Sequence, residues 1–146
     1  MTASNTFEND LAKLIFNNVD IAGIGDAGGL RGSVVAGVLY VSLHTADPGE
    51  AGTQATNECT YTSYARVSVA RTASGWTVSA SEASNTGEVV FPQCTGGSNT
   101  ATHCGVGTDA SGAGKLLASG ALTASLAISN GITPKFNTGQ LDVTVD

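Results

Sequence analysis

The chain has 146 residues, of which 41% are hydrophobic and only 12% are charged, and its formal net charge is −6. Alanine, glycine, threonine and serine together supply 71 residues, so nearly half of the side chains are small. This composition excludes a disordered chain and a coiled coil, and no apolar run approaches the roughly 20 residues of a membrane-spanning helix. The six basic residues are scattered rather than gathered into a stripe, so we expect no nucleic-acid partner. Because no apolar run is long enough, we also expect no membrane partner.

An amphipathic helix is predicted near the start of the chain, from about Thr6 to Asn18. Asn5 and Glu8, three residues apart, resemble a capping box at its N-terminus. Apolar residues then recur at the spacing of one helical face, namely Phe7, Leu11, Leu14, Ile15 and Val19. This stripe either packs on the chain's own core or docks on a neighbouring subunit, and both alternatives stay open. The candidate partner-docking residues are therefore Phe7, Leu11, Leu14 and Ile15.

A glycine-rich stretch follows the helix, with six glycines from Gly23 to Gly37. It predicts a loop or arm, so the expected division is an N-terminal helix and arm at 1–37 and a β-sandwich domain at 38–146. The segment Gly23–Gly28 matches the GxGxxG pattern of dinucleotide-binding loops. That pattern requires a strand before it and a helix after it, and the sequence predicts neither. We therefore expect a plain loop and no cofactor.

From Val38 onward the apolar residues alternate with a period of two, which is typical of β-strands. The first run, Val38–His44, has apolar residues on both faces and predicts a buried strand, which a turn at Ala46–Gly49 ends. Further strands are expected at 65–70, 76–79, 88–91, 102–106, 115–122, 126–128 and 140–145, with a hairpin turn at Ser74–Gly75 and a turn at Asn130–Gly131. The chain is thus predicted to be mainly β, an antiparallel β-sandwich or barrel of about eight short strands with one N-terminal helix.

The three cysteines, Cys59, Cys94 and Cys104, do not have the spacing of a zinc site. Their odd number argues against a disulfide framework, and half-buried free thiols are the expected state. The alternative is a bridge between Cys94 and Cys104. No metal ligands are predicted.

A catalytic reading would pair His44 with Asp47 and use Ser42 or Ser63 as the nucleophile of a hydrolase. His44 and Asp47 flank a tight turn, however, where aspartate usually accepts a hydrogen bond from its own backbone. The acidic residues Asp47, Glu50 and Glu58 lack the spacing of a calcium loop. We therefore expect no catalytic residues and no enzymatic activity.

Residues spread over almost the whole chain carry a resemblance to known proteins. They are the run LYVSLHTADPGEAG at 39–52, Asn57, Glu58, Tyr61, the run YAR at 64–66, Trp76, Phe91, Pro92, CTGG at 94–97, GVGT at 105–108 and SNGITP at 129–134. In these residues the chain resembles small virion structural proteins of tailed bacteriophages, which are often labelled phage tail fibre-like. The resemblance implies a structural virion component and supplies no catalytic residue.

Size and arrangement suggest which virion component to expect. The chain is short for a receptor-binding fibre, whereas a compact β-domain with an N-terminal arm suits a capsid decoration, or cement, protein. Such a protein would bind the major capsid protein and copies of itself. The alternative is a tail-fibre or head-fibre component that contacts the host surface. Met1–Asp10 shows no signal-peptide pattern, so we expect synthesis in the bacterial cytoplasm and assembly into the virion.

Overall fold

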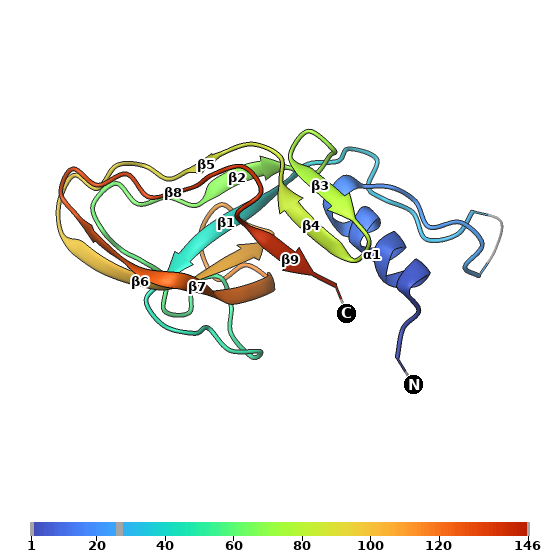
Figure 1. Cartoon of the computed structure of the whole chain (residues 1–146), viewed down its shortest axis with the longest axis horizontal. Coiled ribbons are helices and arrows are strands. Elements are labelled where there is room, and N and C mark those ends of the chain that lie inside the picture. The colour runs from blue at the N-terminus through green and yellow to red at the C-terminus, as the bar shows by residue number, and fades with distance from the viewer. Residues whose placement is uncertain (1, 26–27, 146) are drawn as a thin grey trace. The chain divides into compact units, whose positions relative to one another are not determined.

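The computed structural model describes residues 2–25 and 28–145, and this part of the chain holds one helix and nine strands (Figure 1). The elements are α1 (Asn5–Asn17), β1 (Val38–His44), β2 (Val67–Ala70), β3 (Trp76–Ser79), β4 (Glu82–Asn85), β5 (Val89–Val90), β6 (Ser98–Gly107), β7 (Leu116–Ser129), β8 (Lys135–Phe136) and β9 (Asp142–Thr144). The strands form open sheets of order β2-β1-β6-β7, β3-β4-β9 and β5-β8. The pairings of β1 with β6, β6 with β7, β3 with β4 and β4 with β9 are antiparallel. The predicted mainly β, antiparallel and sandwich-like fold with one N-terminal helix is confirmed.

The chain divides into two compact units. Unit 1 comprises Met1–Val38, Val69–Glu88 and Phe136–Asp146, and unit 2 comprises Leu39–Ser68 and Val89–Lys135. Unit 1 contains α1 and the three-stranded sheet, whereas unit 2 contains most of the four-stranded sheet. The expected division at residue 37 stays a prediction.

The helix of unit 1 begins one residue earlier than the sequence predicts. Ser4 is the N-cap, and its Oγ accepts a hydrogen bond from the backbone N–H of Phe7 at 3.4 Å. The predicted capping box of Asn5 and Glu8 is therefore wrong, because a serine cap was available one position upstream. Asn18 ends the helix in the left-handed conformation, with φ at 57°.

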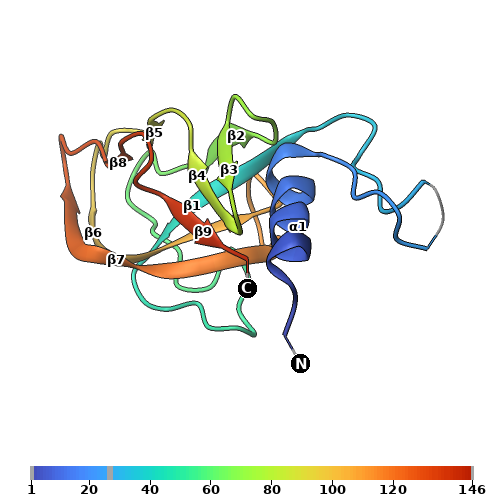
Figure 2. The same ribbon diagram turned by 45° about the vertical axis from the view of Figure 1, so that its right-hand side comes forward.

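The core of unit 1 forms where α1 packs on the β3–β4 hairpin (Figure 2). The rings of Phe16 and Trp76 lie 5.0 Å apart at an angle of 60°. Ala12, Trp76 and Ala83 are completely buried around this contact. One aromatic pair and small neighbours thus allow helix and sheet to approach closely.

The strand pairing of unit 1 differs from the predicted hairpin at Ser74–Gly75. The turn forms, with the Gly75 N–H donating to the Thr72 carbonyl at 2.9 Å. The strands on its two sides nevertheless join different sheets, because β2 neighbours β1 while β3 pairs with β4. The sequence reading missed β4, since its EASN sequence lacks the β-branched and aromatic residues that mark strands.

In unit 2, strand β1 lies between β2 and β6 and is buried on both faces, as predicted. Two predicted strands at 115–122 and 126–128 are one continuous strand, β7, which pairs with β6. A register shift between Ala101 and His103 of β6 accommodates the extra residues of β7. The predicted turn at Asn130–Gly131 is present, with the Ile132 N–H donating to the Ser129 carbonyl at 3.0 Å.

Candidate functional site

The predicted docking stripe of α1 is not the face that the helix buries. The buried residues of α1 are Ala12 and Phe16. The four predicted docking residues divide differently: Phe7 is exposed, whereas Leu11, Leu14 and Ile15 are half-buried. The stripe therefore keeps apolar surface open to solvent beside the packed face. Its role as a docking site stays a prediction.

Arg71 fixes the C-terminal end of α1. Its Nε and Nη2 donate hydrogen bonds to the carbonyls of Ile15 at 2.6 Å and Leu14 at 2.7 Å. The last turn of α1 contains no basic residue of its own. The guanidinium thus supplies the positive charge and the donors that the carbonyl end of a helix favours. A third contact, from Nη1 to the Ser33 Oγ at 2.5 Å, joins the arm to the same anchor.

The predicted arm is closed at its base rather than extended. The backbones of Ile21 and Leu30 exchange hydrogen bonds of 2.8 and 2.9 Å. Asn18 holds Ser33 through three hydrogen bonds, of which the shortest, from the Ser33 N–H, is 2.7 Å. Asp20 accepts a hydrogen bond from the Gly32 N–H at 2.7 Å. The arm is therefore a pinned loop, that is, a loop whose two ends are held together by hydrogen bonds.

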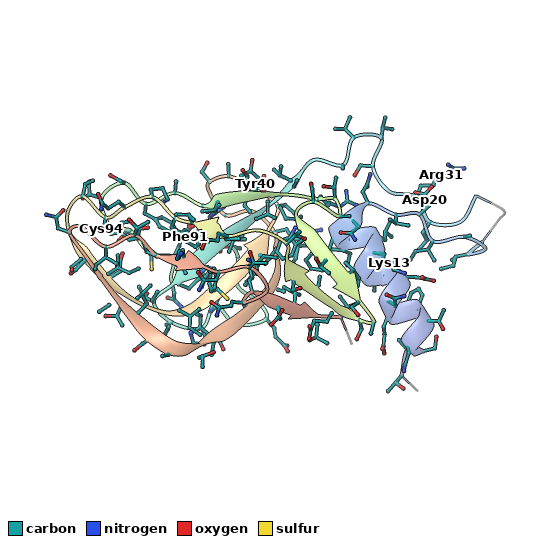
Figure 3. All side chains as sticks on the ribbon, turned by 45° about the horizontal axis from the view of Figure 1, so that its top comes forward. Lys13, Asp20, Arg31, Tyr40, Phe91 and Cys94 are labelled. Atoms are coloured by element: carbon teal, nitrogen blue, oxygen red, sulfur yellow. The ribbon has the colours of Figure 1, made fainter. Side chains whose placement is uncertain are left out.

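The glycine pattern Gly23–Gly28 lies within this loop, and its residues 26 and 27 lie outside the described residues. Asp20 and Arg31 mark the exposed part of the arm in Figure 3, where they form an ion pair at 3.9 Å. The pattern follows α1 and a loop, not a buried strand. Its surroundings therefore differ from those of a dinucleotide-binding loop, as expected.

Exposed apolar side chains gather in the N-terminal segment of unit 1. Ten large hydrophobic residues are exposed in the described part of the chain, and seven of them lie between residues 7 and 38. We call these seven the N-terminal apolar surface: Phe7, Val19, Ile24, Leu30, Val34, Val35 and Val38. Val34 and Val35 are the extreme cases, at 106% and 77% exposure. The seven residues lie in one segment of the chain, and exposed apolar side chains that lie together are typical of a surface that a partner covers.

The residues of the alternative catalytic reading, which the sequence does not favour, come together only in part. The His44 ring is completely buried, with Nε2 at 2.8 Å from the Ser42 Oγ and Nδ1 at 2.8 Å from the Thr56 carbonyl. Burial lowers the pKa of His44 below its ordinary value. Asp47 instead accepts a hydrogen bond from the Gly49 N–H at 2.9 Å, as expected of a turn residue. The Ser63 Oγ is hydrogen-bonded to the Thr95 Oγ1 at 2.6 Å, so Ser63 does not complete a catalytic triad.

A buried ion pair was missed by sequence reasoning. Arg66 binds Glu58 through two hydrogen bonds, Nε to Oε1 at 2.7 Å and Nη2 to Oε2 at 2.8 Å. It also donates to the carbonyls of Asp109 at 2.8 Å and Gly112 at 2.6 Å. The Tyr64 hydroxyl donates to Glu58 Oε1 at 2.9 Å and accepts from the Leu43 N–H at 3.0 Å. Glu58 is thus part of a structural ion pair with Arg66.

The hydrogen bonds to Glu58 raise the pKa of Arg66, and burial raises the pKa of Tyr64. Arg66 keeps its charge, and Tyr64 keeps its hydroxyl proton at neutral pH. The described residues contain no group of three or more His, Cys, Asp or Glu side chains suited to a metal ion.

The three cysteines are free thiols, so the alternative of a Cys94–Cys104 bridge is wrong. Cys59 and Cys94 are buried, and Cys104 is half-buried. Burial raises the pKa of the Cys59 thiol to about 11 and also raises that of Cys104. Raised thiol pKa values are those of structural rather than reactive cysteines.

Comparison with known proteins extends the resemblance seen in the sequence. Among the described residues, no helix is both long enough and apolar enough to cross a membrane. A search of curated proteins finds no match to the chain. A family model described as podophage GP4 fiber I protein gp80 matches residues 2–144. The chain therefore belongs to this family of podophage fibre proteins, and it is a structural component of the bacteriophage virion.

Proposed function

We propose that the chain is a fibre component of the virion that attaches to another virion protein through its N-terminal apolar surface. The family description supports a fibre. The observation that carries the attachment is the concentration of exposed apolar residues between Phe7 and Val38. Covering apolar surface contributes roughly 25 cal/mol per Å², so the adjacent, strongly exposed Val34 and Val35 are strong contact points.

The predicted docking residues of α1 take part in the same proposal. Phe7 belongs to the N-terminal apolar surface, and the half-buried Leu11, Leu14 and Ile15 extend it along the helix. Arg71 and Asn18 hold helix and arm together. Because the arm is pinned before binding, a partner would meet a partly preformed surface, which lowers the entropic cost of docking.

A capsid decoration, or cement, protein is the second candidate. The same surface would then bind the major capsid protein and lie between neighbouring capsid subunits, together with copies of this chain. The pinned apolar arm favours this candidate, because it can contact a subunit other than the one that α1 contacts. Both candidates share the docking surface and differ in location and copy number.

We further propose that the chain has no enzymatic activity. The only histidine near a serine hydroxyl in the described residues is the buried His44, whose two ring nitrogens already have partners. Phage carrying both His44→Gln and Asp47→Ala should assemble and infect as the parent does. Loss of infection with normal incorporation of the variant would contradict this proposal.

The docking proposal is tested with two matched pairs of substitutions. Val34→Ser with Val35→Ser should lower incorporation of the chain into virions at least tenfold, measured by quantitative mass spectrometry of purified particles. Val90→Ser with Ile132→Ser removes comparable apolar side chains, at 45% and 40% exposure, from unit 2. This control should be incorporated normally. Equal incorporation of both variants would overturn the proposal.

Fibre and cement are separated by location and number. Copies counted against the major capsid protein should be few for a fibre and in the hundreds for a cement protein. Antibody against the chain should block adsorption to the host only if it is a host-contacting fibre. Particles without the chain should lose heat resistance only if it is a cement protein.

A further inference from the structure

Strand β7 is the open edge of the four-stranded sheet in unit 2. The order β2-β1-β6-β7 places β6 on one side of β7, and in the described part of the chain no strand pairs with its other side. Figure 2 shows this long strand beside β6. With 14 residues from Leu116 to Ser129, β7 is the longest strand. Its outer edge therefore presents a long row of backbone N–H and C=O groups available for pairing.

The usual protections of an edge strand are largely missing from β7. Its sequence, LLASGALTASLAIS, contains no charged residue and no proline. Native edges are normally blocked by such residues, by short length or by bulges. One irregularity is present, since regular pairing with β6 breaks between Ala121 and Leu126. The first run, Leu116–Ala121, is regular apart from a register shift at its start, and it carries the exposed Leu117.

The charge distribution favours a second copy of the chain as the strand that covers this edge. Unit 2 contains four acidic and three basic residues, whereas unit 1 contains eight acidic and three basic residues. Two copies that meet through unit 2 therefore bring together surfaces of nearly balanced charge. A contact through unit 1 would instead oppose two strongly acidic surfaces.

The sequence of the first run fits antiparallel pairing with itself. In a register centred on Ala118, Leu116 lies opposite Gly120 of the other copy, and Leu117 lies opposite Ser119, so that opposite residues share one face of the sheet. Each leucine thus meets a small residue, and no like charges face each other across the strands. An isologous contact of this kind is self-complementary and closes at two copies.

We propose that the chain dimerises by antiparallel pairing of β7 with β7 of a second copy, centred on Ala118. The contact extends the four-stranded sheet to eight strands across the two copies. It goes beyond the docking proposal and does not depend on it, because the two surfaces belong to different units. A fibre or a cement protein could use the N-terminal apolar surface for attachment to another virion protein and β7 for contact with a second copy of the chain.

The experiment uses the full chain and two matched double variants. Ser119→Lys with Ala121→Lys places positive charges on exposed positions of the run, whereas Ala51→Lys with Ala55→Lys places the same charges on an exposed loop of unit 2. We expect sedimentation equilibrium to show a dimer for the parent and the loop variant. The edge variant should dimerise at least tenfold more weakly while its circular dichroism stays unchanged.

Hydrogen exchange of the unmodified protein provides a test that needs no substitution. Amides of Leu117–Ala121 should become more protected as the protein concentration rises. A parent protein that stays monomeric up to its solubility limit would overturn the proposal, as would an edge variant that dimerises as tightly as the parent. Protection of β7 that arises only when a different virion protein is added would also overturn it, in favour of a foreign strand.

Discussion

At the scale of single residues, Arg66 shows how one buried charge organises unit 2. Its side chain is 2% exposed and its partner Glu58 is 16% exposed, so both charges are largely removed from water. Four hydrogen bonds of the guanidinium offset this desolvation: two to the Glu58 carboxylate and two to the carbonyls of Asp109 and Gly112. Such a pair is strongly destabilising when one member is removed, because the other stays buried without a partner.

Replacing Arg66 with alanine should therefore lower the free energy of unfolding by about 3–5 kcal/mol. Urea unfolding followed by circular dichroism measures this change. Arg31→Ala is the control, since Arg31 and Asp20 lie 3.9 Å apart with side chains 72% and 51% exposed. The control should change stability by less than about 1 kcal/mol. Equal effects of the two substitutions would show that the buried pair is not structurally important.

His44 should make the stability of the protein fall in mildly acidic solution. Burial lowers the pKa of the folded-state ring, while the Thr56 carbonyl and Glu58 oppose this shift and Arg66 and His103 add to it. The unfolded chain thus binds a proton more readily than the folded one below the ordinary histidine pKa of about 6.5. The contribution of neutral His44 is complete above that pH and is lost as the pH falls toward the lower folded-state pKa.

The measurement compares the pH dependence of unfolding in the parent and in His44→Gln. Other titrating groups contribute to both proteins, so the difference between the two slopes isolates His44. We expect the parent to lose stability more steeply than the variant as the pH is lowered from about 6.5. Parallel curves would contradict the assignment.

At the scale of elements, helix α1 shows what periodicity predicts and what it leaves open. The 3.6-residue pattern located the helix within one residue at each end. It did not identify the buried face, because Ala12 and Phe16 belong to no continuous apolar stripe. That face is chosen by Trp76, which lies 60 residues further along the chain. Tertiary contacts of this range leave no local signal in the sequence.

The same limit applies to the strands. Alternation identified β1, β3 and β9 closely, and a buried β1 followed from apolar residues on both of its faces. Strand pairing was not predicted correctly at Ser74–Gly75, because a turn signal does not say which sheet each flanking strand joins. The short strands β4 and β8 were missed, since four and two residues carry too little pattern. The ion pair of Arg66 and Glu58 was likewise not predicted, because only the fold brings the two side chains together.

Arg71 should control the stability of α1, although it lies outside the helix. Arg71→Ala removes two charged donors from the carbonyls of Leu14 and Ile15, which we expect to cost about 2 kcal/mol. Arg71→Lys keeps the charge but not the fork of donors and should recover part of the loss. Hydrogen exchange across the last turn of α1 measures the effect. Unchanged exchange in the alanine variant would contradict the anchoring role.

At the scale of the whole molecule, the chain passes between the two units four times, after Val38, Ser68, Glu88 and Lys135. Each unit is therefore assembled from segments far apart in the sequence, and neither corresponds to a continuous fragment. Strands β1, β2 and β8 each contain residues of both units. When one unit unfolds, the shared strands lose part of their structure, and this also weakens the other unit. We therefore expect both units to unfold in a single cooperative transition.

The aromatic residues provide a separate probe for each unit. The single tryptophan, Trp76, belongs to unit 1, and all three tyrosines, Tyr40, Tyr61 and Tyr64, belong to unit 2. We expect urea unfolding curves from tryptophan fluorescence and tyrosine absorbance to coincide, as a two-state transition requires. The Arg66→Ala substitution sharpens the test, because its direct effect falls in unit 2. If the units unfold together, both probes shift to lower urea by the same amount. A shift of the tyrosine curve alone would show that unit 1 holds its fold independently, through the packing of Phe16 on Trp76.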